Sequence, residues 1–284
     1  MRMQPVILKC GDRQLVLGQR TFIMGVVNVT PDSFSDGGKW LAADHAIAHG
    51  MALAAAGADV LDVGGESTRP GAAPVTAEEE CARVLPVIKG LVREGVSFIS
   101  VDTRHAETAR VCLEEGASWV NDVSGGTHDP AMLTTAKNAD ALVLMHMRGT
   151  PKNMQSGEII YDDVVKEVAD YLAERVNACE AVGIHPEKVL LDPGIGFGKL
   201  LEHNLLLTEH LTRLQGKAAG ILYGPSRKRF LGELTGIEEA SKRDVATQAA
   251  LAVAVAAGAQ LVRVHNVEMA SEFLKVIDGF YRRG

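Results

Sequence analysis

Short apolar runs alternate with longer amphipathic segments along almost the whole chain. The segments between the runs, such as 42–57, 76–95 and 161–183, place apolar residues at helical spacing and end in Gly, a usual C-terminal signal. The runs themselves have the length and the β-branched residues of buried strands. There are eight: 21–27, 59–63, 97–101, 118–123, 141–145, 189–192, 220–224 and 261–264. The pattern predicts strands and helices in regular alternation.

Eight βα units without a composition break indicate a parallel sheet, and eight is the number that closes into a (β/α)8 TIM barrel. A doubly wound open sheet is the alternative, but no GxGxxG motif follows the first strand, where a dinucleotide-binding fold carries it. Residues 4–20 have the pattern of two short strands around a turn. We therefore expect an α/β fold in one domain, with an N-terminal hairpin in 1–20 closing the bottom of a barrel formed by 21–284.

Composition and charge exclude several classes of protein. Apolar residues make up 46% of the chain, which fits a large buried core. A net charge of -7 argues against a protein that follows nucleic-acid phosphates, because such proteins have basic surfaces. No apolar stretch reaches the roughly 20 residues that span a bilayer, and residues 1–14 lack a signal-peptide core. We expect neither a nucleic-acid nor a membrane partner, and a cytoplasmic location.

Polar residues follow every predicted strand. In (β/α)8 enzymes the active site lies at the C-terminal ends of the strands, so these residues are the candidates for chemistry. One Asp or Asn at such a junction is as often a helix cap or a satisfied core group. Polar residues after all eight strands are harder to explain in that way. In chain order they are Asn28, Glu66 to Arg69, Asp102, Asn121 and Asp122, His146, Asp192, Ser226 to Lys228, and Arg263 with His265.

The chemistry of this set points to two kinds of ligand group. Asp102, Asn121 and Asp192 offer planar donors and acceptors, which suit a flat heterocycle with an amide-like edge. Lys228 and Arg263 offer cations, which suit a phosphate or pyrophosphate beside that ring.

Eight stretches at these positions resemble the dihydropteroate synthase family, and together they extend along nearly the whole chain. One such motif is weak evidence, whereas eight in order are specific. They are MGVVNVTPDSFSDGG (24–38), DVGGESTRPGAAPV (62–75), SVDT (100–103), NDVSGG (121–126), MHMRGTPKNMQ (145–155), DPGIGFGK (192–199), SRKRFLG (226–232) and RVHNV (263–267).

The resemblance implies a transferase that condenses 6-hydroxymethyl-7,8-dihydropterin pyrophosphate with 4-aminobenzoate, giving 7,8-dihydropteroate and pyrophosphate in folate biosynthesis. It implies Mg²⁺ with Asn28 as its protein ligand, a homodimer, and inhibition by sulfonamides. The implied pterin contacts are Asp102, Asn121, Met145, Asp192 and Lys228, and the implied pyrophosphate contacts are Asn28, Arg263 and His265. The residues expected to carry catalysis are Asp102, Lys228, Arg263 and Asn28.

The resemblance also implies an aminobenzoate pocket and a lid. The pocket would be lined by Thr68, Arg69, Pro70, Phe197, Lys228, Arg229 and Phe34. Phe34 and Asp36, between Pro31 and Gly37, would belong to a lid that closes over the strand ends. The chain departs from the family pattern at Arg229, where Ser is frequent, at Asn266, where Asp is common, and at Ile195, where Phe is often found.

Two alternatives share the pterin-binding residues. A pterin-dependent methyltransferase domain has the same barrel and the same Asp and Asn residues, but should lack the anion clamp of SRK and RVH. A non-catalytic pterin-binding paralogue should lose the pyrophosphate contacts, which are intact here at Asn28, Arg263 and His265.

Overall fold

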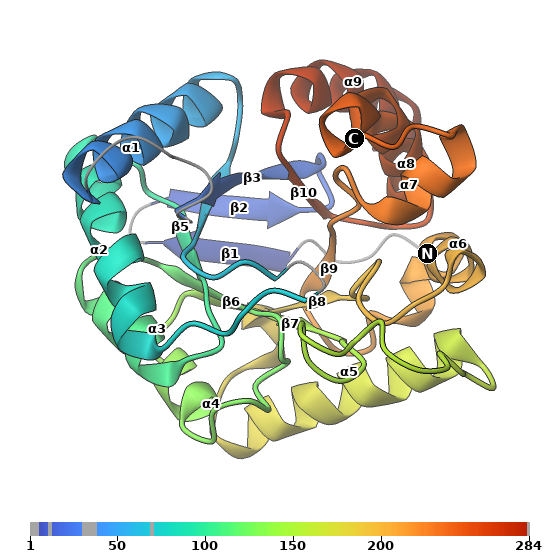
Figure 1. Ribbon diagram of the computed structural model, residues 1–284, viewed down its shortest axis with the longest axis horizontal. Coiled ribbons are helices and arrows are strands. Elements are labelled where there is room, and N and C mark those ends of the chain that lie inside the picture. The colour runs from blue at the N-terminus through green and yellow to red at the C-terminus, as the bar shows by residue number, and fades with distance from the viewer. Residues whose placement is uncertain (1–5, 11–12, 30–38, 69–70, 283–284) are drawn as a thin grey trace.

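The computed structural model describes residues 6–10, 13–29, 39–68 and 71–282, and these form a closed barrel of parallel strands (Figure 1). Around the barrel the order is β10, β3, β4, β5, β6, β7, β8, β9, so the last strand pairs with the first. The (β/α)8 architecture expected from the sequence is confirmed. The strands are β3 (Phe22–Asn28), β4 (Val60–Gly64), β5 (Ile99–Asp102), β6 (Trp119–Asp122), β7 (Ala141–Met145), β8 (Val189–Asp192), β9 (Gly220–Tyr223) and β10 (Leu261–Val264).

Helices surround the barrel (Figure 1). They are α1 (Lys39–Ala55), α2 (Ala77–Arg93), α3 (Ala106–Glu114), α4 (Met132–Ala136), α5 (Val164–Ala181), α6 (Leu201–Glu209), α7 (Arg229–Thr235), α8 (Asp244–Ala256) and α9 (Val267–Tyr281), with short 3₁₀ turns η2 (Pro186–Lys188), η3 (Leu211–Arg213) and η4 (Ala240–Arg243). Local sequence sets several helix starts. Thr76 and Glu79 form a capping box at α2, each side chain accepting from the backbone N–H of the other. The Asp163 carboxylate accepts from the first N–H groups of α5.

A hairpin closes the N-terminal end of the barrel, as the sequence predicted. Strands β1 (Val6–Cys10) and β2 (Arg13–Leu17) pair antiparallel and lie across the barrel in Figure 1. Leu8 and Leu17 are buried in a cluster that includes Phe22 and Trp119, the first residues of β3 and β6. The apolar face of the hairpin therefore covers the bottom of the barrel.

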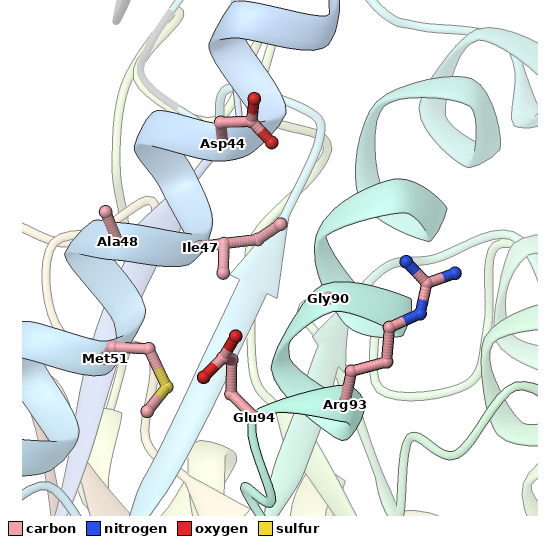
Figure 2. A pocket seen from close by; sticks show the side chains of 7 residues that line it. All are labelled: Asp44, Ile47, Ala48, Met51, Gly90, Arg93 and Glu94. Atoms are coloured by element: carbon pink, nitrogen blue, oxygen red, sulfur yellow. The ribbon is translucent and has the colours of Figure 1, made fainter.

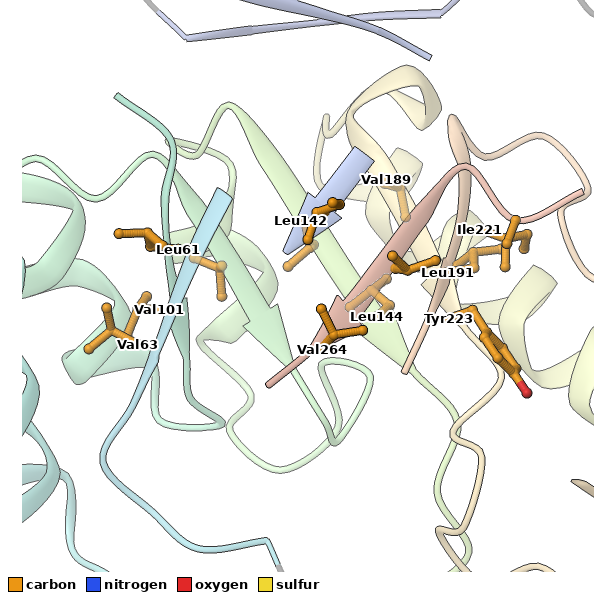
Figure 3. Close-up of a cluster of buried hydrophobic side chains, with 14 of the residues drawn as sticks. Leu61, Val63, Val101, Leu142, Leu144, Val189, Leu191, Ile221, Tyr223 and Val264 are labelled. Carbon is orange, nitrogen blue, oxygen red and sulfur yellow. The ribbon is translucent and has the colours of Figure 1, made fainter. Parts of the chain in front are cut away.

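Side chains alternate between the inside of the barrel and the layer beneath the helices. The outward side chains form the larger apolar core, including Leu61, Val63, Val101, Leu142 and Leu144 (Figure 3). The residues between them face inward, because successive side chains of a strand point to opposite faces of the sheet. The inward positions at the C-terminal ends of the strands are polar: Asp62, Asp102, Asn121, Asp192 and Arg263. The fold thus gathers these polar groups on one inner surface.

Candidate active site

A guanidinium and two carboxylates meet at the C-terminal ends of β4, β5 and β10. Arg263 Nε donates to Asp62 Oδ2 at 2.6 Å, and Arg263 Nη2 donates to Asp102 Oδ2 at 2.8 Å. The Asp62 side chain is fully buried, whereas 23% of the Arg263 side chain is exposed. Charge-assisted bonds of this kind are strong and fix the plane of the guanidinium. They leave Nη1 of Arg263 without a partner among the residues that the structure describes.

Asp62 also binds Asn121, the residue that ends the inner face of β6. Asn121 Nδ2 donates to Asp62 Oδ2 at 2.9 Å, and both side chains are buried. Asp62 was not predicted as a site residue, because it lies within the strand run 59–63. The available signal was its alternation with Val60 and Gly64, which places a carboxylate on the inward face of a strand.

The environment of Asp102 changes its protonation. Burial raises the pKa of Asp102 to about 8, because a carboxylate removed from water loses solvation of its charged form. The positive charge of Arg263 opposes this rise, and the Asp62 carboxylate adds to it. A carboxyl group that titrates near neutral pH is typical of a functional site.

Asp192, Lys228 and Phe197 form the opposite part of the site. Asp192 Oδ1 accepts from the backbone N–H of Gly194 at 2.7 Å, and burial raises the pKa of Asp192 while Lys228 opposes that rise. Burial also lowers the pKa of Lys228 to about 8. The Lys228 ammonium donates to the carbonyl oxygen of Ile195 and lies 4.6 Å from the centre of the Phe197 ring. A cation beside an aromatic face suits a ligand with both an aryl ring and a carboxylate.

A second buried lysine, which was not predicted as a site residue, connects the loops after β7 and β8. Lys199 Nζ lies 2.9 Å from His146 Nδ1, and it donates to the carbonyl oxygens of Gly194 and Phe197 at 3.0 and 3.1 Å. Burial lowers the pKa of Lys199 to about 7 and that of His146 to about 3. His146 is therefore neutral at physiological pH, and its Nδ1 lies within hydrogen-bond distance of the Lys199 amine. Lys199 holds the loop that carries Phe197.

Arg227 precedes Lys228 and has a left-handed backbone, with φ of 61°. Its guanidinium makes a two-point contact with Asp244, at 2.7 and 2.9 Å. Asn266 Nδ2 donates to the same carboxylate at 3.0 Å, and Asn266 Oδ1 caps α9. Left-handed non-glycine residues are uncommon and need support from their surroundings. The amide of Asn266 helps to hold Asp244 in its contact with Arg227 and places no like charge beside that carboxylate.

The remaining predicted residues within the described ranges occupy different settings. Asn28 is exposed at the end of β3, and Met145 is buried at the end of β7, opposite Asp192 in the register. His265 Nδ1 lies 2.9 Å from Ser226 Oγ in the loop after β9. Thr68 is half-buried after β4.

Arg229 lies apart from this group in the structure. Its side chain is 84% exposed, and Nε donates to Glu233 at 2.7 Å. Its contact with aminobenzoate stays a prediction. Four other predicted residues lie outside the described residues, so the pocket wall and the lid also stay predictions: Phe34, Asp36, Arg69 and Pro70.

The oxygen and nitrogen donors of the described residues fit a metal ion whose ligands are mostly water molecules and substrate oxygens. Within those ranges, no group of three or more His, Cys, Asp or Glu side chains is placed to hold an ion. Mg²⁺ needs only one or two protein oxygens when phosphate oxygens and waters complete its shell. The amide oxygen of Asn28, exposed at a strand end, suits such a role.

A groove on the outside of the barrel lacks this concentration of polar groups. It lies between α1 and α2 (Figure 2), and its lining residues are Asp44, Ile47, Ala48, Met51, Gly90, Arg93 and Glu94. The helices pack closely because Gly90 has no side chain: an added Cβ would lie 2.2 Å from Ile47 Cδ1.

Across the described part of the chain, no helix is long and apolar enough to cross a membrane.

Comparison with known proteins shows similarity along nearly all of the chain. The model of the pterin binding enzyme family matches residues 24–265. A dihydropteroate synthase of Synechocystis is 40% identical over 279 residues, covering 98% of this chain and 96% of the relative. A mitochondrial folate synthesis bifunctional protein of Arabidopsis thaliana is 42% identical over 98% of this chain. This chain spans only about half, 52%, of that relative's length.

Solved structures of a Xanthomonas albilineans protein agree with this similarity. Its dihydropteroate synthase with 4-aminobenzoic acid is 43% identical, with a TM-score of 0.90 over 99% of this chain and 100% of the relative. Its complex with 7,8-dihydropteroate is 41% identical, with a TM-score of 0.86 over 98% of this chain and 100% of the relative.

Proposed function

Because the chain belongs to the family of pterin binding enzymes, we propose that it acts as a dihydropteroate synthase in folate biosynthesis. It would join 6-hydroxymethyl-7,8-dihydropterin pyrophosphate to 4-aminobenzoate and release pyrophosphate. The observation that carries the proposal is the inner polar surface at the strand ends. There, carboxylates and an amide lie beside the guanidinium of Arg263, while Lys228 and Phe197 lie together at the loops after β9 and β8.

The pterin ring would bind to Asp102, Asn121 and Asp192. Carboxylates accept hydrogen bonds from the amino and ring N–H groups of an aminopyrimidine edge, and the amide adds a complementary contact. Met145, buried beside Asp192 in the register, would pack along the ring. Positive charge would develop on the pterin as pyrophosphate leaves. That charge would favour the ionised form of Asp102, whose pKa of about 8 lets it change between its neutral and ionised forms near neutral pH.

The pyrophosphate would bind to Arg263 and His265. Arg263 retains Nη1 for a phosphate oxygen while its other nitrogens bind carboxylates. Its charge stabilises the negative charge that moves onto the departing group. Asn28 would hold Mg²⁺, which supplies further positive charge to the phosphate oxygens when bound.

The second substrate would bind beside Phe197, with its carboxylate near Lys228. The amine of 4-aminobenzoate is already a nucleophile, so its position matters more than removal of its proton. In the reaction a C–N bond forms at the pterin methylene carbon, the C–O bond to pyrophosphate breaks, and the amine loses one proton. Thr68, Arg69, Pro70, Arg229 and Phe34 are the further proposed contacts, and Asp36 the further proposed lid residue. Sulfonamides, which resemble aminobenzoate, should compete at this position.

Incubation of the pure protein with pterin pyrophosphate, 4-aminobenzoate and Mg²⁺ tests the proposal. We expect one 7,8-dihydropteroate for each pyrophosphate released, measured by chromatography and by a phosphate assay after pyrophosphatase treatment. Pterin binding without either product would instead indicate a non-catalytic pterin-binding protein. Transfer of a methyl group from a methylated pterin to a corrinoid protein would indicate the methyltransferase alternative.

A homodimer is proposed on the basis of exposed apolar side chains on the C-terminal helices. Val253 on α8 is 48% exposed, and Val276 and Phe280 on α9 are 61% and 67% exposed. Exposed apolar side chains gathered on one part of a protein are typical of an interface. Sedimentation equilibrium should give twice the mass of the chain, and a single-chain mass would contradict the proposal.

A further inference from the structure

We propose that Asp62 is a positioning residue that orients both Asn121 and Arg263, and so links the pterin and pyrophosphate parts of the site. The inference rests on the proposed function, because the role of Asp62 follows from the substrate contacts proposed for Asn121 and Arg263. Asp62 Oδ2 accepts from Asn121 Nδ2 at 2.9 Å and from Arg263 Nε at 2.6 Å. One oxygen atom thus contacts two residues that would touch different parts of one substrate.

The contact with Asp62 determines which way the Asn121 amide faces. Asp62 Oδ2 is the acceptor for Arg263 Nε, and the Asn121 amide turns its nitrogen, not its oxygen, toward the same atom. The amide oxygen of Asn121 then points to the other side of the group. Asn121 therefore offers an acceptor to the pterin, and it recognises an N–H group of the ring. Without Asp62, the two orientations of the amide would be close in energy.

The contact with Asp62 also fixes the guanidinium of Arg263. Its Nε binds Asp62 from β4, and its Nη2 binds Asp102 from β5, so two neighbouring strands determine its plane. A guanidinium held at two nitrogens loses little further freedom when a phosphate binds the third. Asp62 thus prepares Arg263 for the pyrophosphate.

Asp62 makes no direct contact with solvent. Its side chain is fully buried, and its second oxygen, Oδ1, has no partner among the described residues. Next to it in the register, Ser100 is also buried, and its hydroxyl has no described partner. A buried carboxylate is costly unless its partners compensate. Within the described part of the chain, that compensation comes from Asn121 and Arg263.

The variant Asp62→Asn keeps the shape of the side chain and removes its charge. The phosphate-free ligand hydroxymethylpterin reports on the pterin part of the site, and we expect its Kd to rise about tenfold, as for loss of a hydrogen bond to a charged group. We also expect inhibition by free pyrophosphate to weaken about tenfold. The Michaelis constant for aminobenzoate should stay within about twofold, because its proposed contacts at Lys228 and Phe197 do not include Asp62.

Double-mutant cycles separate orientation from general damage. In an Asn121→Ala background, Asp62→Asn should change the affinity for hydroxymethylpterin by less than about threefold, because the amide it orients is gone. In an Arg263→Ala background, it should leave pyrophosphate inhibition unchanged. Equal losses with and without Asn121 and Arg263 would overturn the inference, and so would an unchanged affinity for hydroxymethylpterin in Asp62→Asn.

Ser100→Ala is the matched control. It changes a buried inward residue next to Asp62 in the register but removes no described hydrogen bond, so all binding constants should stay unchanged. If circular dichroism shows that Asp62→Asn does not fold, Asp62→Ser replaces it, since its shorter side chain also removes the carboxylate oxygen that Asn121 and Arg263 contact. The same outcomes then apply.

The wild-type protein separates this inference from the proposed function. If the wild type forms no dihydropteroate, the proposed function fails, whatever the variants do. If the wild type forms it and the cycles are additive, the proposed function stands and the role of Asp62 is wrong.

Discussion

At the scale of single residues, the site depends on hydrogen bonds that hold its two cations, Arg263 and Lys228, in place. Arg263 is held by Asp62 and Asp102, and Lys228 donates to the carbonyl oxygen of Ile195 beside the Phe197 ring. Each cation is therefore placed by buried acceptors before any substrate arrives. Preorganised charges of this kind lower a barrier because they need no rearrangement as the reaction proceeds.

Arg263→Ala should remove binding of the pyrophosphate group and largely spare the pterin ring. The Kd of the pterin pyrophosphate should rise at least about a hundredfold, because the contact of Nη1 with a phosphate oxygen and the positive charge beside it are both lost, while that of hydroxymethylpterin should change much less. Isothermal titration calorimetry measures both. Equal losses for the two ligands would count against the assigned role of Arg263.

Affinity for aminobenzoate should fall at alkaline pH. Burial lowers the pKa of Lys228 to about 8, so its ammonium form is largely lost by pH 9. With pterin pyrophosphate saturating, the Michaelis constant for aminobenzoate should rise roughly tenfold between pH 7 and 9. Lys228→Arg keeps its charge over this range and should flatten the profile. A flat wild-type profile would show that Lys228 does not hold the carboxylate.

The same pKa shift affects stability. The pKa of Lys228 is lower in the folded than in the unfolded protein, so its charged form costs stability below pH 8. The contribution of Lys228 to the free energy of unfolding should therefore rise between pH 8 and about 10.4.

At the scale of elements, the loop between β8 and α6 sets the shape of the site. Asp192 begins it, Lys199 ends it, and the backbone of Gly194 contacts both side chains. The sequence motif DPGIGFGK located this loop but not its internal contacts. Those contacts depend on the distant residue His146, which the barrel register brings beside it.

Gly194→Ala tests the packing of this loop. Gly194 has φ of 66°, and an added Cβ would lie 1.8 Å from the carbonyl oxygen of His146. We expect the free energy of unfolding to fall by more than about 3 kcal/mol, because strain and a backbone clash add. The matched control is Gly157→Ala, with φ of 69° and nothing within 4 Å of the added Cβ. It should cost only about 1 kcal/mol in urea unfolding. Similar losses in both would show that the clash is relieved.

The sequence predicted the elements well and the contacts among them less well. The eight apolar runs located every barrel strand to within two residues, because buried parallel strands have a strong local pattern. Asp62 and Lys199 were missed because their importance comes from partners 59 and 53 residues away in sequence. The contact of Arg229 with aminobenzoate stays a prediction, and its side chain pairs with Glu233 in the structure. Which partner a side chain contacts depends on how the residues around it pack, and a sequence motif does not specify that packing.

At the scale of the whole molecule, the two ends of the barrel have separate tasks. The hairpin β1–β2 covers the apolar N-terminal end, and the polar groups gather at the other end. This division is typical of (β/α)8 enzymes, where one face contributes stability and the other chemistry. Substitutions in the hairpin should therefore change stability without changing the reaction.

Leu8→Ala tests this separation. Leu8 is 2% exposed and packs on the bottom of the barrel, so its truncation should lower the free energy of unfolding by about 2–4 kcal/mol. Ile7→Ala on the opposite face of β1, where Ile7 is 46% exposed, should cost less than about 1 kcal/mol. The kcat per folded molecule should equal that of the wild type in both. A reduced kcat in Leu8→Ala would show that the two ends are coupled.

A crystal structure of the protein with bound pterin pyrophosphate tests the central claim most directly. The pterin ring should lie within hydrogen-bond distance of Asp102, Asn121 and Asp192, with a phosphate oxygen on Nη1 of Arg263. A ring bound away from these three residues, or a pyrophosphate that does not touch Arg263, would contradict the account.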